Sequence, residues 1–283
     1  MGEINDALRR AREEQQPDVR RPTSAPRSPE LQSSGGLRPE PSKKRDDAVT
    51  ISDEATGSWA ARAVVVDQRD GVSEYYRHFA LRVLRELKHR NARSVLVTSA
   101  LREEGKTTTA CNLALALSSL AGGRPIALID LDLRRPSVKK SLGIAADHGI
   151  EEVLAGDIEL SVACVPTQMG ALDIYPITRP TRHAHELLSG DHFKELVREL
   201  NRKYEYLIFD SPPALLVPDV PLALAEIDCA VAVARAGVTS KRAFDEMLAI
   251  VEETRLLGVF LNEASAPRHK NQYGYYLDED AEE

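Results

Sequence analysis

The sequence predicts an α/β fold with a mostly parallel sheet flanked by helices. Short apolar runs recur between residues 94 and 261, and amphipathic helical patterns separate them. The runs are apolar throughout instead of alternating with polar residues, which is typical of strands buried on both faces. Strands that alternate with helices join through right-handed crossovers into a parallel sheet.

The predicted elements follow one another in a regular order. We expect strands over 94–98, 126–130, 172–177, 206–210, 229–234 and 257–261. Apolar residues at helical spacing predict helices over 74–87, 107–121, 193–200 and 241–254. One domain, residues 59–266, then accounts for nearly all of the apolar core.

The two ends of the chain differ from this domain in composition. Residues 15–58 are rich in Pro, Ser, Arg and acidic residues, so they predict a disordered linker that cannot offset its conformational entropy by burial. Residues 1–14 predict a short helix, which is either a fraying chain end or a docking segment for a partner. Residues 267–283 form a polar tail that is expected to be flexible.

Composition excludes several classes of function. A formal net charge of −7 argues against a nucleic-acid partner, because such proteins neutralise phosphates with basic residues. The three cysteines are isolated and lack metal-ligand spacing, which is typical of a reducing compartment. No apolar run is long enough to span a bilayer and the first residues are too polar for a signal peptide, so we expect a cytoplasmic protein.

A phosphate-binding loop is predicted between the first strand and the helix that follows it. Residues 99–109 have the sequence SALREEGKTTT, in which G-K-T opens the helix. Free N–H groups and the helix dipole favour an anion there, the lysine reaches the β- and γ-phosphates, and the threonine hydroxyl binds Mg²⁺. The predicted nucleotide contacts are Glu104, Gly105, Lys106, Thr107 and Thr108. The alternative is a tight turn without a ligand.

Three aspartates end or follow two other predicted strands. Asp130 and Asp132 belong to the sequence IDLDLRRPS, and Asp210 belongs to YLIFDSPP. Carboxylates at the carboxyl ends of parallel strands face the crevice where ligands bind. Neighbouring carboxylates repel each other unless a cation such as Mg²⁺ lies between them. Alternatively, Arg134 and Arg135 could pair with Asp130 and Asp132.

With these motifs, the chain resembles the bacterial tyrosine kinase family. The similarity covers about residues 74–276 and includes the loop, the I-D-L-D-L-R-R-P element and the F-D-S-P-P element. It implies a P-loop NTPase-like fold related to the MinD and ParA ATPases, with ATP and Mg²⁺ as cofactors. It also implies that the γ-phosphoryl group is transferred to C-terminal tyrosines, here Tyr273, Tyr275 and Tyr276.

The resemblance also assigns roles and partners. Asp130 and Asp210 would set the Mg²⁺ shell, Asp132 would accept the tyrosine proton, and Asn262 would lie near the adenine. The implied partners are a transmembrane chain-length determinant that activates the kinase, neighbouring subunits of a ring and a cognate tyrosine phosphatase. The transmembrane partner would recruit the chain to the inner membrane, where it would regulate the length and export of capsule or exopolysaccharide chains.

The sequence departs from the family at two places. The family loop has P-G-E-G-K, whereas Glu103 replaces the first of these glycines here, which costs about 1 kcal/mol if that position is left-handed. Arg102 could offset this change, and we expect weakened ATP binding. The family's ring motif is E-x-x-R-x-x-R. Glu74 and Arg77 match its first two fixed positions, but Ala80 replaces the second arginine.

Two rival functions stay open on the sequence. A MinD- or ParA-type partitioning ATPase would carry a second lysine where Leu101 stands, and the chain has no basic amphipathic C-terminal helix. A catalytically weak scaffold for a polysaccharide co-polymerase is favoured by Glu103. The retained lysine, aspartates and tyrosines speak against it.

Overall fold

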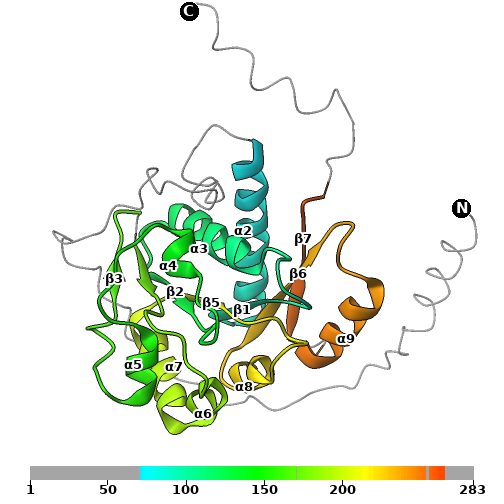
Figure 1. Cartoon of the computed structure of the whole chain (residues 1–283). Helices are drawn as coiled ribbons and strands as arrows, with labels where there is room; N and C mark the ends of the chain where they lie inside the picture. Colours follow the sequence, from blue (N-terminus) through cyan, green and yellow to red (C-terminus); the bar gives the residue numbers. More distant parts are fainter. Residues whose placement is uncertain (1–70, 170, 253–254, 265–283) are drawn as a thin grey trace, which may run out of the picture. The chain divides into compact units, whose positions relative to one another are not determined.

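The computed structural model describes residues 71–169, 171–252 and 255–264. These residues form a seven-stranded sheet covered by helices on both faces (Figure 1). The fold is the predicted α/β class, a mostly parallel sheet with flanking helices. The predicted segments 1–14, 15–58 and 267–283 lie outside the described residues, and so do both ends of the predicted domain 59–266.

The described elements match most of the predicted ones closely. The strands are β1 (Ser94–Ser99), β2 (Ile126–Asp130), β3 (Val165–Pro166), β4 (Leu172–Tyr175), β5 (Tyr206–Asp210), β6 (Cys229–Arg235) and β7 (Leu256–Asn262). The longer helices are α2 (Gly71–Arg90), α3 (Lys106–Leu120), α7 (Asp191–Lys203) and α9 (Lys241–Val251). The short helices are α4 (Val138–Ser141), α5 (Ile150–Ala155), α6 (Ala184–Ser189) and α8 (Asp219–Leu224). No long apolar helix that could cross a membrane occurs within the described ranges.

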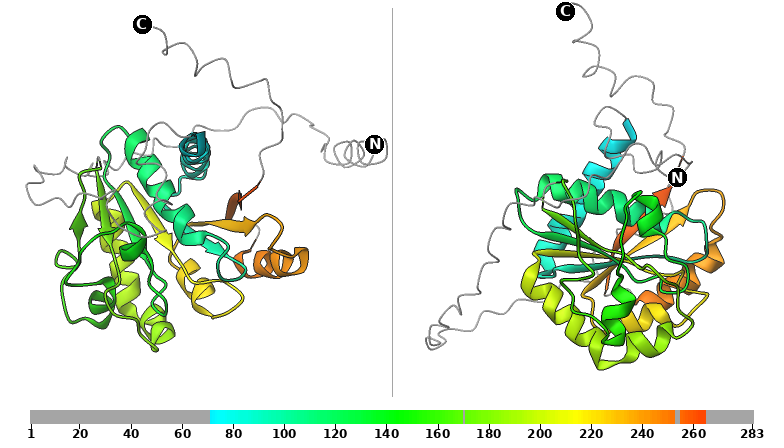
Figure 2. Two further views of the ribbon diagram at one scale, coloured as in Figure 1. Left: turned by 45° about the horizontal axis from the view of Figure 1, so that its top comes forward. Right: turned by 60° about the vertical axis from the view of Figure 1, so that its left-hand side comes forward.

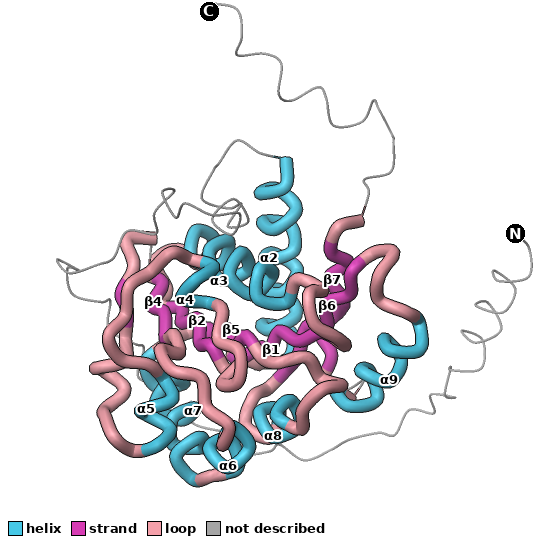
Figure 3. Tube along the Cα trace, in the orientation of Figure 1, coloured by secondary structure: helices cyan, strands magenta, loops and turns pink. Residues whose placement is uncertain are grey.

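The strand order brings the three predicted motifs side by side. The sheet runs β3-β4-β2-β5-β1-β6-β7, and all pairs are parallel except β3 with β4. In this register Asp210 of β5 pairs with Asp130 of β2 on one side and with Val97 of β1 on the other. The loops that follow β1, β2 and β5, drawn pink in Figure 3, therefore leave the same edge of the sheet.

Each face of the sheet has its own apolar core. Helices α2, α3 and α4 pack on one face and α5 to α9 on the other, and Figure 2 shows these two layers with the sheet between them. The strands β1, β2 and β5 are buried along their whole length, which explains why their sequences are apolar throughout.

Helix α2 covers the end of the sheet next to β7. Tyr76 stacks on Phe260 with ring centroids 5.2 Å apart, and Phe79 approaches the same ring at 4.7 Å. Val83 and Leu87 are buried, as the amphipathic pattern predicts. Ala80 is also completely buried, so the position that carries arginine in the family's ring motif faces the core of this protein.

Candidate functional site

The loop between β1 and α3, predicted to bind phosphate, contains two left-handed residues. Gly105, the residue before α3, has a φ of 95°. A Cβ atom at this position would lie 2.1 Å from Nδ2 of Asn262, so both the backbone conformation and the space around it require glycine. Glu103 has a φ of 63°, which confirms that this position is left-handed in spite of its side chain.

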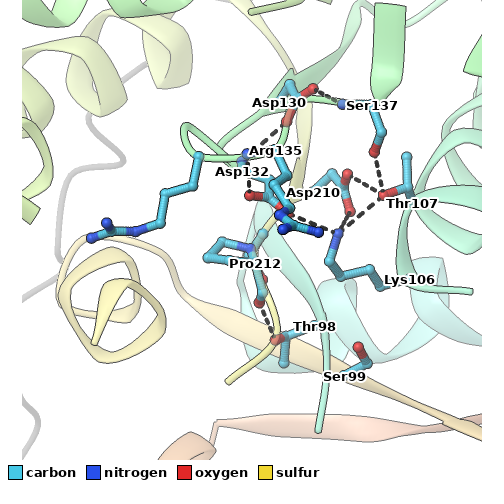
Figure 4. A network of polar contacts seen from close by, with 12 residues as sticks. Thr98, Ser99, Lys106, Thr107, Asp130, Asp132, Arg135, Ser137, Asp210 and Pro212 are labelled. Carbon is cyan, nitrogen blue, oxygen red and sulfur yellow. Dashed lines mark hydrogen bonds and ion pairs between the residues drawn. The ribbon is translucent and has the colours of Figure 1, made fainter. Parts of the chain in front are cut away.

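Lys106 and Thr107 begin α3 and point to the aspartates of the neighbouring strands. Nζ of Lys106 lies 3.2 Å from Oδ2 of Asp132 and 4.0 Å from Oδ1 of Asp210. The Thr107 hydroxyl donates a hydrogen bond to Oδ2 of Asp210 at 2.7 Å and lies 2.9 Å from Oγ of Ser137. Figure 4 shows these contacts as one network around the lysine.

Asp130 is buried and holds the loop that follows β2. Its Oδ1 accepts the backbone N–H of Asp132 at 3.0 Å, and its Oδ2 accepts those of Ser137 and Val138, both at 3.1 Å. Burial, followed by the charge of Asp210, raises the pKa of Asp130. Asp130 therefore shapes the loop on which Asp132 lies, and a place for it in a Mg²⁺ shell stays a prediction.

Asp210 is fully buried, and its Oδ1 has no hydrogen-bond partner among the residues that the structure describes. Burial raises its pKa to about 6, although Lys106 and the Thr107 hydroxyl act in the opposite direction. Burial alone would lower the pKa of Lys106, but Asp210, Asp132 and Asp130 together raise it, so the ammonium group stays charged. A buried carboxylate oxygen that accepts no hydrogen bond from the described residues, beside a threonine hydroxyl, fits a Mg²⁺ ion, which prefers oxygen ligands.

A cavity of about 720 Å³ opens at this edge of the sheet. Its lining includes six of the predicted site residues: Gly105, Lys106, Thr107, Thr108, Asp132 and Asn262. The side chain of Glu104 turns away from solvent, where it accepts hydrogen bonds from the Leu101 N–H at 2.7 Å and from the Thr239 hydroxyl. The part of Glu104 left for a nucleotide is therefore its backbone.

The structure adds residues to the site that the sequence did not indicate. Ser137 reaches Thr107 from the loop after β2, and Arg235 at the end of β6 lines the cavity. Arg134 forms its ion pair with Asp219, at 3.1 Å, and not with Asp130 or Asp132 as the alternative interpretation proposed. Ser137 closes the IDLDLRRPS motif and Arg235 ends β6, but nothing in either sequence indicates the contacts that bring these two side chains to the site. The predicted acceptors Tyr273, Tyr275 and Tyr276 lie outside the described residues.

The fold and the site together define the class of P-loop nucleotide-binding proteins. A family described as AAA domain matches residues 103–255. The tyrosine-protein kinase YwqD of Bacillus subtilis is 33% identical over 211 residues, which are 74% of this chain and 87% of that protein. The chain belongs to the bacterial tyrosine-protein kinase family, as the motifs predicted.

Other proteins share part of this sequence or its fold. The succinoglycan biosynthesis transport protein ExoP of Rhizobium meliloti is 27% identical over 246 residues, and this chain spans 85% of its own length but only 30% of ExoP. The kinase domain of VpsO is 29% identical, with a TM-score of 0.62 over 68% of this chain and 96% of that one. The septum site-determining protein MinD of Pyrococcus horikoshii, solved with Mg-ADP, shares the fold at a TM-score of 0.51 and 24% identity, over 60% of this chain and 68% of that one.

Proposed function

We propose that this chain is an ATP-dependent tyrosine autokinase that phosphorylates its own C-terminal tyrosines. The observation that supports this most strongly is the position of Lys106 at the start of α3, within 4.0 Å of carboxylates from the end of β5 and from the loop after β2. A lysine at the start of a helix opposes the helix dipole unless an anion binds there. The phosphates of ATP would supply that anion in a cavity of sufficient size.

The residues of the site divide the work of phosphoryl transfer. Backbone N–H groups from Glu104 to Thr108 and the ammonium group of Lys106 would hold the phosphates and neutralise their charge. Asp132 would accept the proton of the tyrosine hydroxyl. A bond then forms between the phenolic oxygen and the γ-phosphorus, the bond from that phosphorus to the bridging oxygen breaks, and ADP leaves. Asn262, which lines the cavity, would contact the adenosine part of ATP.

Mg²⁺, when bound, would neutralise charge on the β- and γ-phosphates. Thr107 and Asp210 would hold it, and the 2.7 Å hydrogen bond between this hydroxyl and this carboxylate supports that proposal. Asp130 would support this shell through the loop that it fixes, or would join it directly. The Asp132 carboxylate stays next to Lys106 and faces the cavity.

We further propose that the kinase regulates polysaccharide production. The similarity to ExoP, a succinoglycan biosynthesis transport protein, supports this role. The proposed partner is a transmembrane chain-length determinant that recruits this cytoplasmic chain to the inner membrane and activates it. Transfer would occur in trans between subunits of a ring, and a cognate phosphatase would reverse it.

Phosphopeptide mapping by mass spectrometry tests the autokinase directly. The purified chain is incubated with Mg-ATP beside the variants Lys106→Ala and Lys241→Ala. Lys241 is a matched control because it also begins a helix, α9, but lies exposed on the surface. We expect phosphate on Tyr273, Tyr275 or Tyr276 in the parent and in Lys241→Ala, and none in Lys106→Ala.

Two outcomes would contradict the proposal. One is unchanged phosphotyrosine in a folded Lys106→Ala variant, which would place the catalytic site elsewhere. The other is a parent chain that binds ATP but stays unphosphorylated even with the cytoplasmic segment of its activator. The second outcome would favour the catalytically weak scaffold, for which the left-handed Glu103 is the specific observation.

A further inference from the structure

The phosphate-binding loop contains a left-handed residue that is not glycine. Glu103 has a φ of 63°, a conformation that residues with a Cβ rarely adopt because this atom approaches the following carbonyl oxygen. The side chain of Glu103 is exposed, so packing does not hold the residue in this conformation. Some other contact must stabilise the backbone there.

Arg235 contacts the backbone of this strained residue. Its Nη1 donates a hydrogen bond to the carbonyl oxygen of Glu103 at 3.2 Å. Its Nε and Nη2 donate to Oε2 of Glu263 at 2.8 and 2.6 Å. Arg235 ends β6 and pairs in register with Asn262 of β7, directly before Glu263. The guanidinium is therefore fixed by two neighbouring strands.

The rest of the loop is bonded to the same part of the sheet. Nδ2 of Asn262 donates to the carbonyl oxygen of Glu104 at 3.1 Å, and the Thr239 hydroxyl bonds the Glu104 side chain. The Thr239 hydroxyl also accepts the backbone N–H of Arg235 at 2.8 Å. These contacts fix Glu104, whereas the carbonyl oxygen of Glu103 accepts its hydrogen bond from Arg235.

We infer that Arg235 is a positioning residue, which keeps the Glu103 loop in the shape that presents its N–H groups to phosphate. The inference rests on the nucleotide site proposed above. A glycine at position 103, as in the family's loop, would adopt this backbone without strain. With glutamate at this position, the hydrogen bond from Arg235 stabilises the left-handed conformation instead. Arg102, the residue that the sequence suggested for this compensation, is exposed.

A double-mutant cycle tests this coupling. The variants are Arg235→Gln, Glu103→Gly and the two combined, and affinity for Mg-ATP is measured by calorimetry. We expect Arg235→Gln to weaken binding about tenfold when Glu103 is present and less than about twofold when residue 103 is glycine. In the nucleotide-free protein, Arg235→Gln should speed hydrogen exchange at the amides of Glu104 and Gly105 when Glu103 is present. It should change the exchange rate much less when residue 103 is glycine.

Two further variants complete the design. Arg242→Gln is the matched control, because it removes an exposed arginine ion pair with Glu246 on α9 that does not touch the loop. Glu263→Gln keeps the arginine but weakens its ion pair with residue 263. We therefore expect this variant, like Arg235→Gln, to bind Mg-ATP more weakly than the parent. This second variant preserves the test if Arg235→Gln folds poorly.

The outcomes separate the inference from the proposed function. Equal weakening in both backgrounds would mean that Arg235 contacts the nucleotide directly, and unchanged affinity would mean that it has no role; either result overturns the inference alone. A folded parent chain that binds no Mg-ATP would overturn the proposed function and this inference with it.

Discussion

Among single residues, Asp210 should make the stability of the nucleotide-free protein depend on pH. Burial, offset in part by Lys106, raises its pKa from the ordinary 3.8 to about 6. A carboxyl group with a raised pKa ionises more easily in the unfolded chain than in the fold. The folded protein therefore loses stability as the pH rises from about 4 to about 6, and the loss persists at higher pH.

The variant Asp210→Asn removes this titration. Its free energy of unfolding relative to the parent should rise with pH by on the order of 3 kcal/mol between about pH 4 and about pH 7. Urea unfolding at a series of pH values measures this difference, and Asp245→Asn, on the surface of α9, serves as control. A difference that does not change with pH would show that Asp210 is ionised in the fold throughout this range.

Glu103 gives a second prediction for a single residue. Glycine at this left-handed position should raise the free energy of unfolding by up to about 1 kcal/mol, because the strain of the Cβ atom is removed. Asn91 has a φ of 52° but belongs to a residue type that tolerates this conformation, so Asn91→Gly should have a smaller effect. Equal changes in urea unfolding for both variants would contradict the assignment of strain to Glu103.

For whole elements, helix α2 decides whether the family's ring motif can be completed. Ala80 is completely buried, whereas the next residue, Leu81, is 48% exposed. Ala80→Arg should therefore lower the free energy of unfolding by about 3 kcal/mol or more, since a long charged side chain would enter a packed core. Leu81→Arg should change it by less than about 0.5 kcal/mol.

Thermal or urea unfolding of the two variants, with sedimentation of each, checks this prediction. A stable Ala80→Arg protein that assembles into a larger species would contradict it. That result would mean that α2 can rotate to expose position 80, and the missing arginine alone would then explain any lack of a ring.

The elements also show why sequence predicts some parts of this protein better than others. Strands β2 and β5 end at Asp130 and Asp210 as predicted, because an apolar run buried on both faces stops sharply at a charged residue. The two residues of β3 give no periodic signal, and this strand was missed.

The same contrast holds for the site. Residues at strand ends and at the start of α3 were predicted, because parallel strands and a helix N-terminus place them at one edge. Ser137 and Arg235 were not, since their roles depend on contacts between residues far apart in the sequence. The three N–H bonds to Asp130 likewise appear only when the chain after β2 turns back on this carboxylate.

For the whole molecule, net charge would link the proposed phosphorylation to the proposed assembly. Phosphate on Tyr273, Tyr275 and Tyr276 would take the formal net charge from −7 to about −12. The new charges would lie beside Asp278, Glu279 and Asp280, so the tail becomes a dense negative segment. Repulsion among such segments should separate subunits that a ring brings together, and this repulsion is screened by salt.

Analytical ultracentrifugation before and after incubation with Mg-ATP measures this effect. We expect the phosphorylated chain to sediment as a smaller species, and the difference to shrink at about 0.5 M salt, where the Debye length is only a few ångströms. The variant with all three tyrosines changed to phenylalanine keeps the aromatic rings but cannot accept phosphate, so its assembly should not change. A shift in this variant would assign the effect to nucleotide binding, and no shift in the parent would mean that the tail charge does not control assembly.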